Sequence, residues 1–138
     1  MRIIKTVLAV SDASCATASL ADDFYMFHAP SGNIQCAIMT GDYNSARCDV
    51  MEVTKMSFPT QPADCDLDWG HAFEVGSTGA GAPACAGDTV ADPSGFVLGY
   101  GQSFSKGGFT CQSEKTGMTC TNEEGHGFSV AKAAQKVF

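Results

Sequence analysis

Six cysteines after residue 21 constrain this chain more than any other feature of its sequence. They are Cys36, Cys48, Cys65, Cys85, Cys111 and Cys120. An even number of cysteines in a small exported domain indicates a disulfide framework, because the modest core of such a domain gains stability from cross-links. No two of them have the short spacing of a zinc knuckle, so the pattern favours disulfides over zinc–thiolate binding.

Hairpin geometry favours one of the fifteen pairings that six cysteines allow. If Cys111 faces Cys120 across a hairpin, Glu114 faces Gly117 and Lys115-Thr116 form a two-residue loop, the commonest hairpin length. Directly opposed residues at a non-hydrogen-bonded site lie close enough for a disulfide. The sequence therefore predicts a Cys111–Cys120 bridge.

The same reasoning applies to Cys36 and Cys48. Pairing them leaves Gly41-Asp42-Tyr43 as a three-residue loop. Cys65 and Cys85 then remain, and they would close a longer segment rich in glycine and alanine. In the chain-entropy account of disulfides, such a bridge stabilises the fold by about 3 kcal/mol.

The first 21 residues read as an imperfect export signal. Arg2 and Lys5 supply a positive start, an apolar run follows, and Ser19-Leu20-Ala21 forms a small-x-small cleavage site. Asp12 is the flaw, because it places a charge where the apolar run should continue. We expect a signal peptide over 1–21 and a periplasmic or secreted protein; the alternative is an irregular N-terminal arm of a cytosolic protein.

The remainder, 22–138, is expected to form a single disulfide-rich, mainly β domain. A length of 138 residues, with 44% hydrophobic and 17% charged residues, is ordinary for one globular domain. Short segments between glycine and proline turns favour a small sandwich or barrel of antiparallel strands. Strands are expected near 24–28, 34–39, 46–53, 71–75, 96–100, 103–112, 118–122 and 127–130. Residues 76–86 read as a flexible loop tied down by Cys85. Residues 131–137 have the composition of a short C-terminal helix, although such a helix is too short to be stable alone.

The two hairpins with predicted bridges share an outline. Ser31-Gly32 precedes Cys36 and Cys48, and Gly107-Gly108 precedes Cys111 and Cys120. One hypothesis is that they are equivalent parts of one β fold, and the alternative is coincidence.

The net charge of the chain argues against two classes of binding partner. A net charge of −7 argues against nucleic acid, because an acidic surface repels phosphate backbones and no basic stripe is present. Anionic membrane surfaces are disfavoured for the same reason. No segment of the sequence is long and apolar enough to predict a membrane span.

Three histidines, His28, His71 and His126, could ligate a metal or supply a general base. None has HExxH or HxH spacing. His126 is bracketed by glycines, which give access and suit a ligand contact, but a packed side chain beside tight turns fits equally. We therefore name His126, with the lone Trp69 and with Tyr100, as candidate ligand contacts rather than catalysts.

Asp64, Asp66 and Asp68 resemble the start of a calcium loop, since hard cations take oxygen ligands at alternate positions. Trp69 then stands where an EF-hand loop needs glycine, so a solvated acidic turn is the favoured interpretation. No G-x-S-x-G elbow or P-loop ending occurs, and all six cysteines have partners, so we expect no catalytic nucleophile and no cofactor.

Scattered motifs carry a family resemblance. They are Pro30-Ser31-Gly32-Asn33-Ile34-x-Cys36, Arg47-Cys48-Asp49, Asp68-Trp69-Gly70, Cys85-x-Gly87-Asp88, Tyr100-Gly101, Cys111, Gly117-x-x-Cys120 and Gly125-His126-Gly127-Phe128. Together they resemble a family of small secreted bacterial proteins of unknown function. The resemblance covers nearly the whole chain after residue 21. It implies an exported domain with three disulfides, and it brings no activity, cofactor or catalytic residue.

Three functional hypotheses follow. The favoured one is a non-enzymatic binding domain for a protein or cell-envelope component. The second is an envelope hydrolase that uses His126 with a carboxylate, which requires His126 beside an acid in a concave site. The third is a structural subunit of an extracellular assembly, which requires an unprotected sheet edge.

Overall fold

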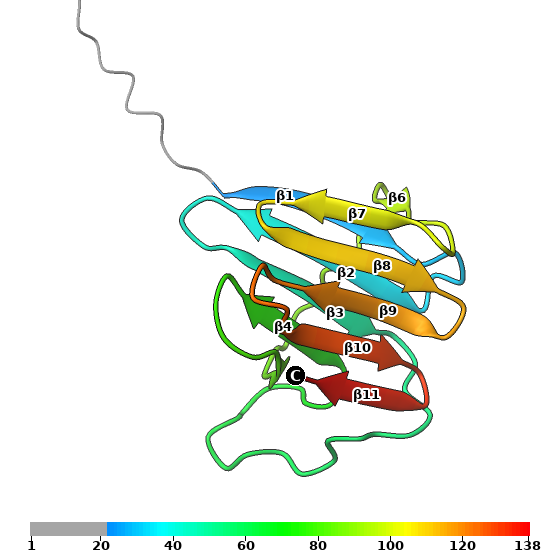
Figure 1. The fold of residues 1–138 in the computed structure, drawn as a ribbon. Helices are drawn as coiled ribbons and strands as arrows, with labels where there is room; N and C mark the ends of the chain where they lie inside the picture. Colours follow the sequence, from blue (N-terminus) through cyan, green and yellow to red (C-terminus); the bar gives the residue numbers. More distant parts are fainter. Residues whose placement is uncertain (1–21) are drawn as a thin grey trace, which may run out of the picture.

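The computed structural model describes residues 22–138, so the expected leader over 1–21 lies outside the described residues. The described chain is all β, with eleven strands in two sheets that stack face to face (Figure 1). This confirms the disulfide-stapled sandwich. No helix of the described residues is long and apolar enough to cross a membrane.

Sheet A has six strands in the order β5-β4-β3-β2-β1-β6. Their bounds are β1 Asp23–His28, β2 Ile34–Thr40, β3 Ser45–Val50, β4 Ala72–Gly76, β5 Ala82–Ala84 and β6 Phe96–Val97. All neighbours are antiparallel except β1 and β6, which pair in parallel.

Sheet B has five antiparallel strands in the order β11-β10-β9-β8-β7. Their bounds are β7 Ser103–Lys106, β8 Phe109–Glu114, β9 Gly117–Thr121, β10 Gly127–Ala131 and β11 Ala134–Val137. Because consecutive strands are joined by tight turns, the β8–β9 and β10–β11 turns lie at one end of the sandwich, and the β9–β10 turn lies at the other (Figure 1).

Three disulfides join the predicted partners: Cys36–Cys48, Cys65–Cys85 and Cys111–Cys120. The predicted registers are confirmed as well, since Cys36 faces Cys48, Cys111 faces Cys120, and Glu114 faces Gly117. The Cα atoms of the two hairpin pairs are 4.1 and 4.0 Å apart, as expected for directly opposed residues.

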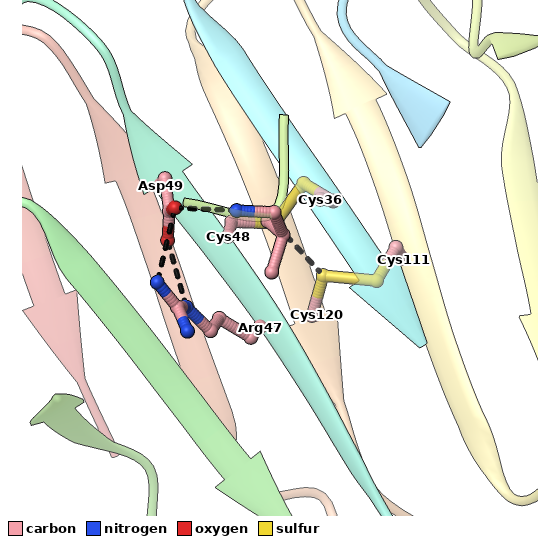
Figure 2. Close-up of a disulfide and its surroundings, with 7 residues drawn as sticks. Cys36, Arg47, Cys48, Asp49, Cys111 and Cys120 are labelled. Carbon is pink, nitrogen blue, oxygen red and sulfur yellow. Dashed lines mark hydrogen bonds and ion pairs between the residues drawn. A yellow bond between two sulfur atoms is a disulfide. The ribbon is translucent and has the colours of Figure 1, made fainter. Parts of the chain in front are cut away.

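The two hairpin disulfides meet in the core. Cys36–Cys48 lies in sheet A, Cys111–Cys120 lies in sheet B, and the Sγ atoms of Cys48 and Cys120 are 3.7 Å apart (Figure 2). Both sulfurs are oxidised, so this is van der Waals packing. Large buried side chains surround them, among them Phe27, Phe73, Phe109 and Phe128. The two similar hairpins thus occupy matching places in facing sheets, which agrees with the hypothesis that they are equivalent.

The expected C-terminal helix over 131–137 is wrong. Ala131 ends β10, and Ala134–Val137 forms β11, with Val130 opposite Gln135. Seven residues are too few for a stable helix alone, and pairing with β10 buries Gln135.

Two other segments differ from expectation. Residues 103–112 are not one strand but β7 and β8, separated by a turn at Gly107-Gly108. Residues 76–86 are not a free loop throughout, because Ala82–Ala84 pairs with β4 as an edge strand. Pro83 cannot donate to a further strand and suits an edge.

Candidate functional site

A cleft lies at the end of the sandwich that holds the β8–β9 and β10–β11 turns. This end cleft has a volume of about 600 Å³. It is lined by Ala29, Ser31, Gly32, Asn33, Ile34, Met51, Glu52, Tyr100, Glu114, Lys115, Gly117, Ala131 and Lys132. Both sheets contribute, so the cleft exists only when the sandwich is assembled.

Sheet A supplies one wall through the β1–β2 turn and the chain after β3. Asn33 ties the two together, because its Oδ1 accepts from the Glu52 N–H at 2.8 Å and its Nδ2 donates to the Glu52 carbonyl at 3.2 Å. The Met51 N–H donates to the Asn33 carbonyl at 2.7 Å. Buried Ala29 and Ile34 add apolar surface to this wall. The three hydrogen bonds of Asn33 therefore fix the shape of this wall.

Sheet B supplies the opposite wall through its two hairpin tips. The carbonyl of Lys132 accepts from the backbone N–H groups of Thr54 and Lys55, at 2.7 and 3.3 Å. The carbonyl of Ala131 accepts from Gln135 Nε2 at 2.9 Å. These bonds anchor the β10–β11 tip and place the exposed Lys132 side chain on the cleft.

Tyr100 is the one predicted contact that lies in the cleft. Its side chain is 43% exposed. The next residue is anchored to β8, because the Gly101 N–H donates to the Ser113 carbonyl at 2.6 Å. An exposed ring on an anchored turn presents an apolar face to a ligand with little loss of conformational freedom.

Trp69 is placed elsewhere and has a structural role. Its Nε1 donates to the Phe58 carbonyl at 2.9 Å and the residue is half-buried. It therefore fastens the long 51–71 loop, with the help of the Cys65–Cys85 bridge.

His126 lies in the β9–β10 turn, at the end of the sandwich opposite the cleft (Figure 1). Its backbone closes the turn, because its N–H donates to Asn122 Oδ1 at 3.1 Å and its carbonyl accepts from the Asn122 N–H at 2.8 Å. The side chain is exposed. Within residues 22–138 no ion pair or hydrogen bond joins the His126 ring to a carboxylate.

The three histidines do not converge. His28 ends β1, His71 precedes β4, and His126 is at the far turn. Asp64, Asp66 and Asp68 are exposed. Across residues 22–138 no group of three His, Cys, Asp or Glu side chains could hold a metal ion, so the structure does not gather the aspartates as calcium ligands.

An ion-pair network on the outer face of sheet A was missed by sequence reasoning. Arg47 and Asp49 stand two apart on β3 and share a face, with Arg47 Nε 2.9 Å from Asp49 Oδ1 (Figure 2). Arg47 also binds Asp88, through the carboxylate at 3.1 Å and the backbone carbonyl at 3.0 Å. The Val90 N–H donates to Asp49 Oδ2 at 3.0 Å. The network fastens residues 88–90 across β3, where Arg47 and Asp49 are both buried.

Burial acts to lower the pKa of Arg47, but hydrogen bonds and charge from Asp49 and Asp88 outweigh it and raise the pKa overall. Arg47 is therefore a permanent structural cation. The arginine-x-aspartate spacing on a predicted strand was the signal that could have shown this pairing.

Comparison with known proteins gives a family but no activity. The model of one protein family, described as "Family of unknown function (DUF6636)", matches residues 4–138. No curated protein and no solved structure matches. The expected membership of an uncharacterised family is confirmed, whereas its bacterial and secreted nature stays a prediction.

Proposed function

Because the chain belongs to DUF6636, a family of unknown function, we propose a function from its geometry: it is an exported, non-enzymatic binding domain that holds a small polar ligand in the end cleft. The observation that carries the proposal is the cleft itself. Turns from both sheets line it, and loops on a rigid scaffold are where binding residues concentrate.

Size supports a small ligand. Sites for small molecules occupy about 300–1,000 Å³ and combine apolar surface with a few polar groups. The volume of about 600 Å³ falls within this range. A protein partner would instead cover about 800 Å² of surface on each side. A fragment of a cell-envelope component is therefore the form of partner that the cleft suits.

Export is part of the proposal and rests on the three disulfides, which persist in oxidising compartments. The periplasm or the cell exterior supplies such conditions. The hydrolase hypothesis gains no support from the surroundings of His126 described above.

Nuclear magnetic resonance (NMR) titration of the purified protein with the small-molecule fraction of a cell-envelope extract tests the function. We expect the amide signals of Gly32, Tyr100 and Gly117 in the cleft to shift, and those of Gly79 and Gly125 at the far end to stay in place. Tyr100→Ala should weaken the response and His126→Ala should not. Shifts centred at the far end, or no shift from any fraction, would contradict the proposal.

A second candidate function is assembly through β7. β7 is the last strand of sheet B, and within the described residues its outer side carries no backbone hydrogen bond. Exposed Phe96 and Val97 lie beside this edge of the sandwich, where Phe96 packs edge-on against Phe104 of β7 at 4.9 Å. A Ser105→Pro variant should abolish assembly in sedimentation experiments if β7 adds strands. An unchanged sedimentation profile would exclude this function.

A further inference from the structure

Charges of both signs line the end cleft without neutralising one another. Lys115 and Lys132 face it, and so do Glu52 and Glu114. All four side chains are exposed. Within residues 22–138 the only ion pairs belong to Arg47, and neither Arg47 nor its two partners line the cleft. The two lysines are a quarter of the eight Lys and Arg residues of an acidic chain, so their presence in one cleft is a local departure from its overall charge.

The four charges come from three separate parts of the fold. Glu52 belongs to the sheet A wall, where Asn33 holds its backbone. Lys115 is at the β8–β9 tip, next to Glu114, and Lys132 is at the β10–β11 tip. Glu114 accepts a hydrogen bond from Gln112 at 2.7 Å and so has a preferred orientation. A ligand that bridges the walls meets both signs of charge.

Such a lining selects against ligands with one kind of charge. An anion attracted by the two lysines is repelled by the two glutamates, and the reverse holds for a cation. A ligand that carries both an ammonium and a carboxylate group is attracted by both pairs. The Tyr100 ring strengthens the preference, because an aromatic face also attracts a cation.

Resting on the proposed binding function, we propose that the ligand of the end cleft is zwitterionic, a short peptide with a free amino group and a free carboxylate. The glutamates and Tyr100 hold the ammonium group, and Lys115 and Lys132 hold the carboxylate. An extended chain of three residues spans about 10 Å, which separates its two charged ends across a cleft of this size. Buried Ala29 and Ile34 provide apolar surface for a small side chain between them.

Four forms of one tripeptide test this proposal on the full chain. The probes are Ala-Ala-Ala unblocked, acetylated, amidated and blocked at both ends, so that only charge differs. We expect the unblocked peptide to bind about fivefold more tightly than either singly blocked form, as measured by NMR titration of the cleft amides. The advantage should shrink in high salt, because the charges are exposed.

Variants that remove charges from the cleft test which side chains bind each end of the peptide. Lys115→Gln with Lys132→Gln should weaken the binding of the unblocked and acetylated forms and should strengthen that of the amidated form, because it removes the repulsion between the lysines and the ammonium group. Glu52→Gln should weaken the binding of the unblocked and amidated forms and should strengthen that of the acetylated form, because it removes the repulsion between Glu52 and the carboxylate. Lys136→Gln, at a lysine outside the cleft that lies over the Phe138 ring, is the matched control and should change nothing. A general structural defect would weaken all four forms equally.

The outcomes separate this inference from the function beneath it. If the doubly blocked peptide binds the cleft as tightly as the unblocked one, the cleft is a binding site but the ligand is not a zwitterion. If no tripeptide form binds while an envelope fraction still shifts the cleft amides, the inference is wrong and the binding function stands. If neither the tripeptides nor the envelope fraction shifts the cleft amide signals, the zwitterionic ligand and the binding function are both wrong.

Discussion

At the scale of single residues, the Arg47 side chain is held by two carboxylates and a backbone carbonyl. It is 8% exposed and Asp49 is 5% exposed, so Asp49 would be an uncompensated buried charge without Arg47. Asp88 also binds Arg47, but its side chain is 80% exposed. The two carboxylates therefore contribute very differently to stability, although both pair with the same guanidinium.

Arg47→Met should lower the free energy of unfolding by about 3 kcal/mol, because it leaves Asp49 buried and unpaired. Asp88→Ala should lower it by less than about 1 kcal/mol, since water already screens that pair and the Asp88 backbone carbonyl still accepts from Arg47. Urea denaturation measures both values. Equal losses would show that residues 88–90 are held by the Asp88 carboxylate rather than by the buried pair.

Tyr43 and Glu74 give a prediction about pH. The hydrogen bond from the Tyr43 hydroxyl to Glu74, with burial and the Glu74 charge, raises the pKa of Tyr43 above its ordinary value of 10.0. The phenol is protonated in this bond, so its stabilising effect is present below pH 10 and is lost as the pH rises through the folded-state pKa. Glu74→Gln should lower the Tyr43 pKa towards 10.0, as followed by phenolate absorbance. A difference titration against Tyr43→Phe isolates this tyrosine from the other two.

At the scale of elements, the β8–β9 hairpin shows how a turn without glycine can close. The two loop residues, Lys115 and Thr116, both have negative φ, as do all the non-glycine residues described. The residue after them, Gly117, takes the positive value instead, at φ 140°. The predicted two-residue loop is therefore correct, and the glycine that it needs stands one position later.

Gly117→Ala should lower the free energy of unfolding by more than about 2 kcal/mol. Its φ is unfavourable for a side chain, and a Cβ there would collide with the Val130 carbonyl of the neighbouring strand. Gly101→Ala is the matched control, because Gly101 has φ 85° but open space around it, and it should lose only about 1 kcal/mol. Thermal denaturation compares them, and equal losses would rule out a steric role for Gly117.

At the scale of the whole molecule, two of the three disulfides are core packing as much as cross-links. Cys36, Cys48, Cys111 and Cys120 are all fully buried, and they join the centres of the two sheets through the Cys48–Cys120 contact. Cys85 is exposed, and its bridge to Cys65 closes a surface loop. The three bridges should therefore contribute different amounts to the free energy of unfolding, because two of them fill the core and one closes a surface loop.

Loop entropy alone ranks these bridges by sequence separation. Cys65–Cys85 spans 20 residues and Cys36–Cys48 spans 12, a difference in favour of the longer loop of about 0.5 kcal/mol. Replacing Cys36 and Cys48 by alanine also leaves a cavity in the core, which costs about 1 kcal/mol or more. We predict that the Cys36→Ala, Cys48→Ala protein is less stable than the Cys65→Ala, Cys85→Ala protein in urea denaturation. The reverse order would mean that loop entropy dominates.

The sequence by itself determined the fold class, the three disulfide pairs and the register of two hairpins. Each of these depends on local alternation or on the short reach of a disulfide, and both can be read from spacing. The sequence also gave Tyr100 as a contact candidate, which the structure places in the cleft.

Only the tertiary structure decided the rest. Residues 131–137 became a strand because β10 lay beside them, although their composition favours a helix. Glu52, Lys115 and Lys132 share a cleft because turns from two sheets meet at one end, and His126 is excluded because its turn lies at the other. Sequence spacing carries no information about which distant turns share an end of a sandwich, since sheet stacking sets that distance.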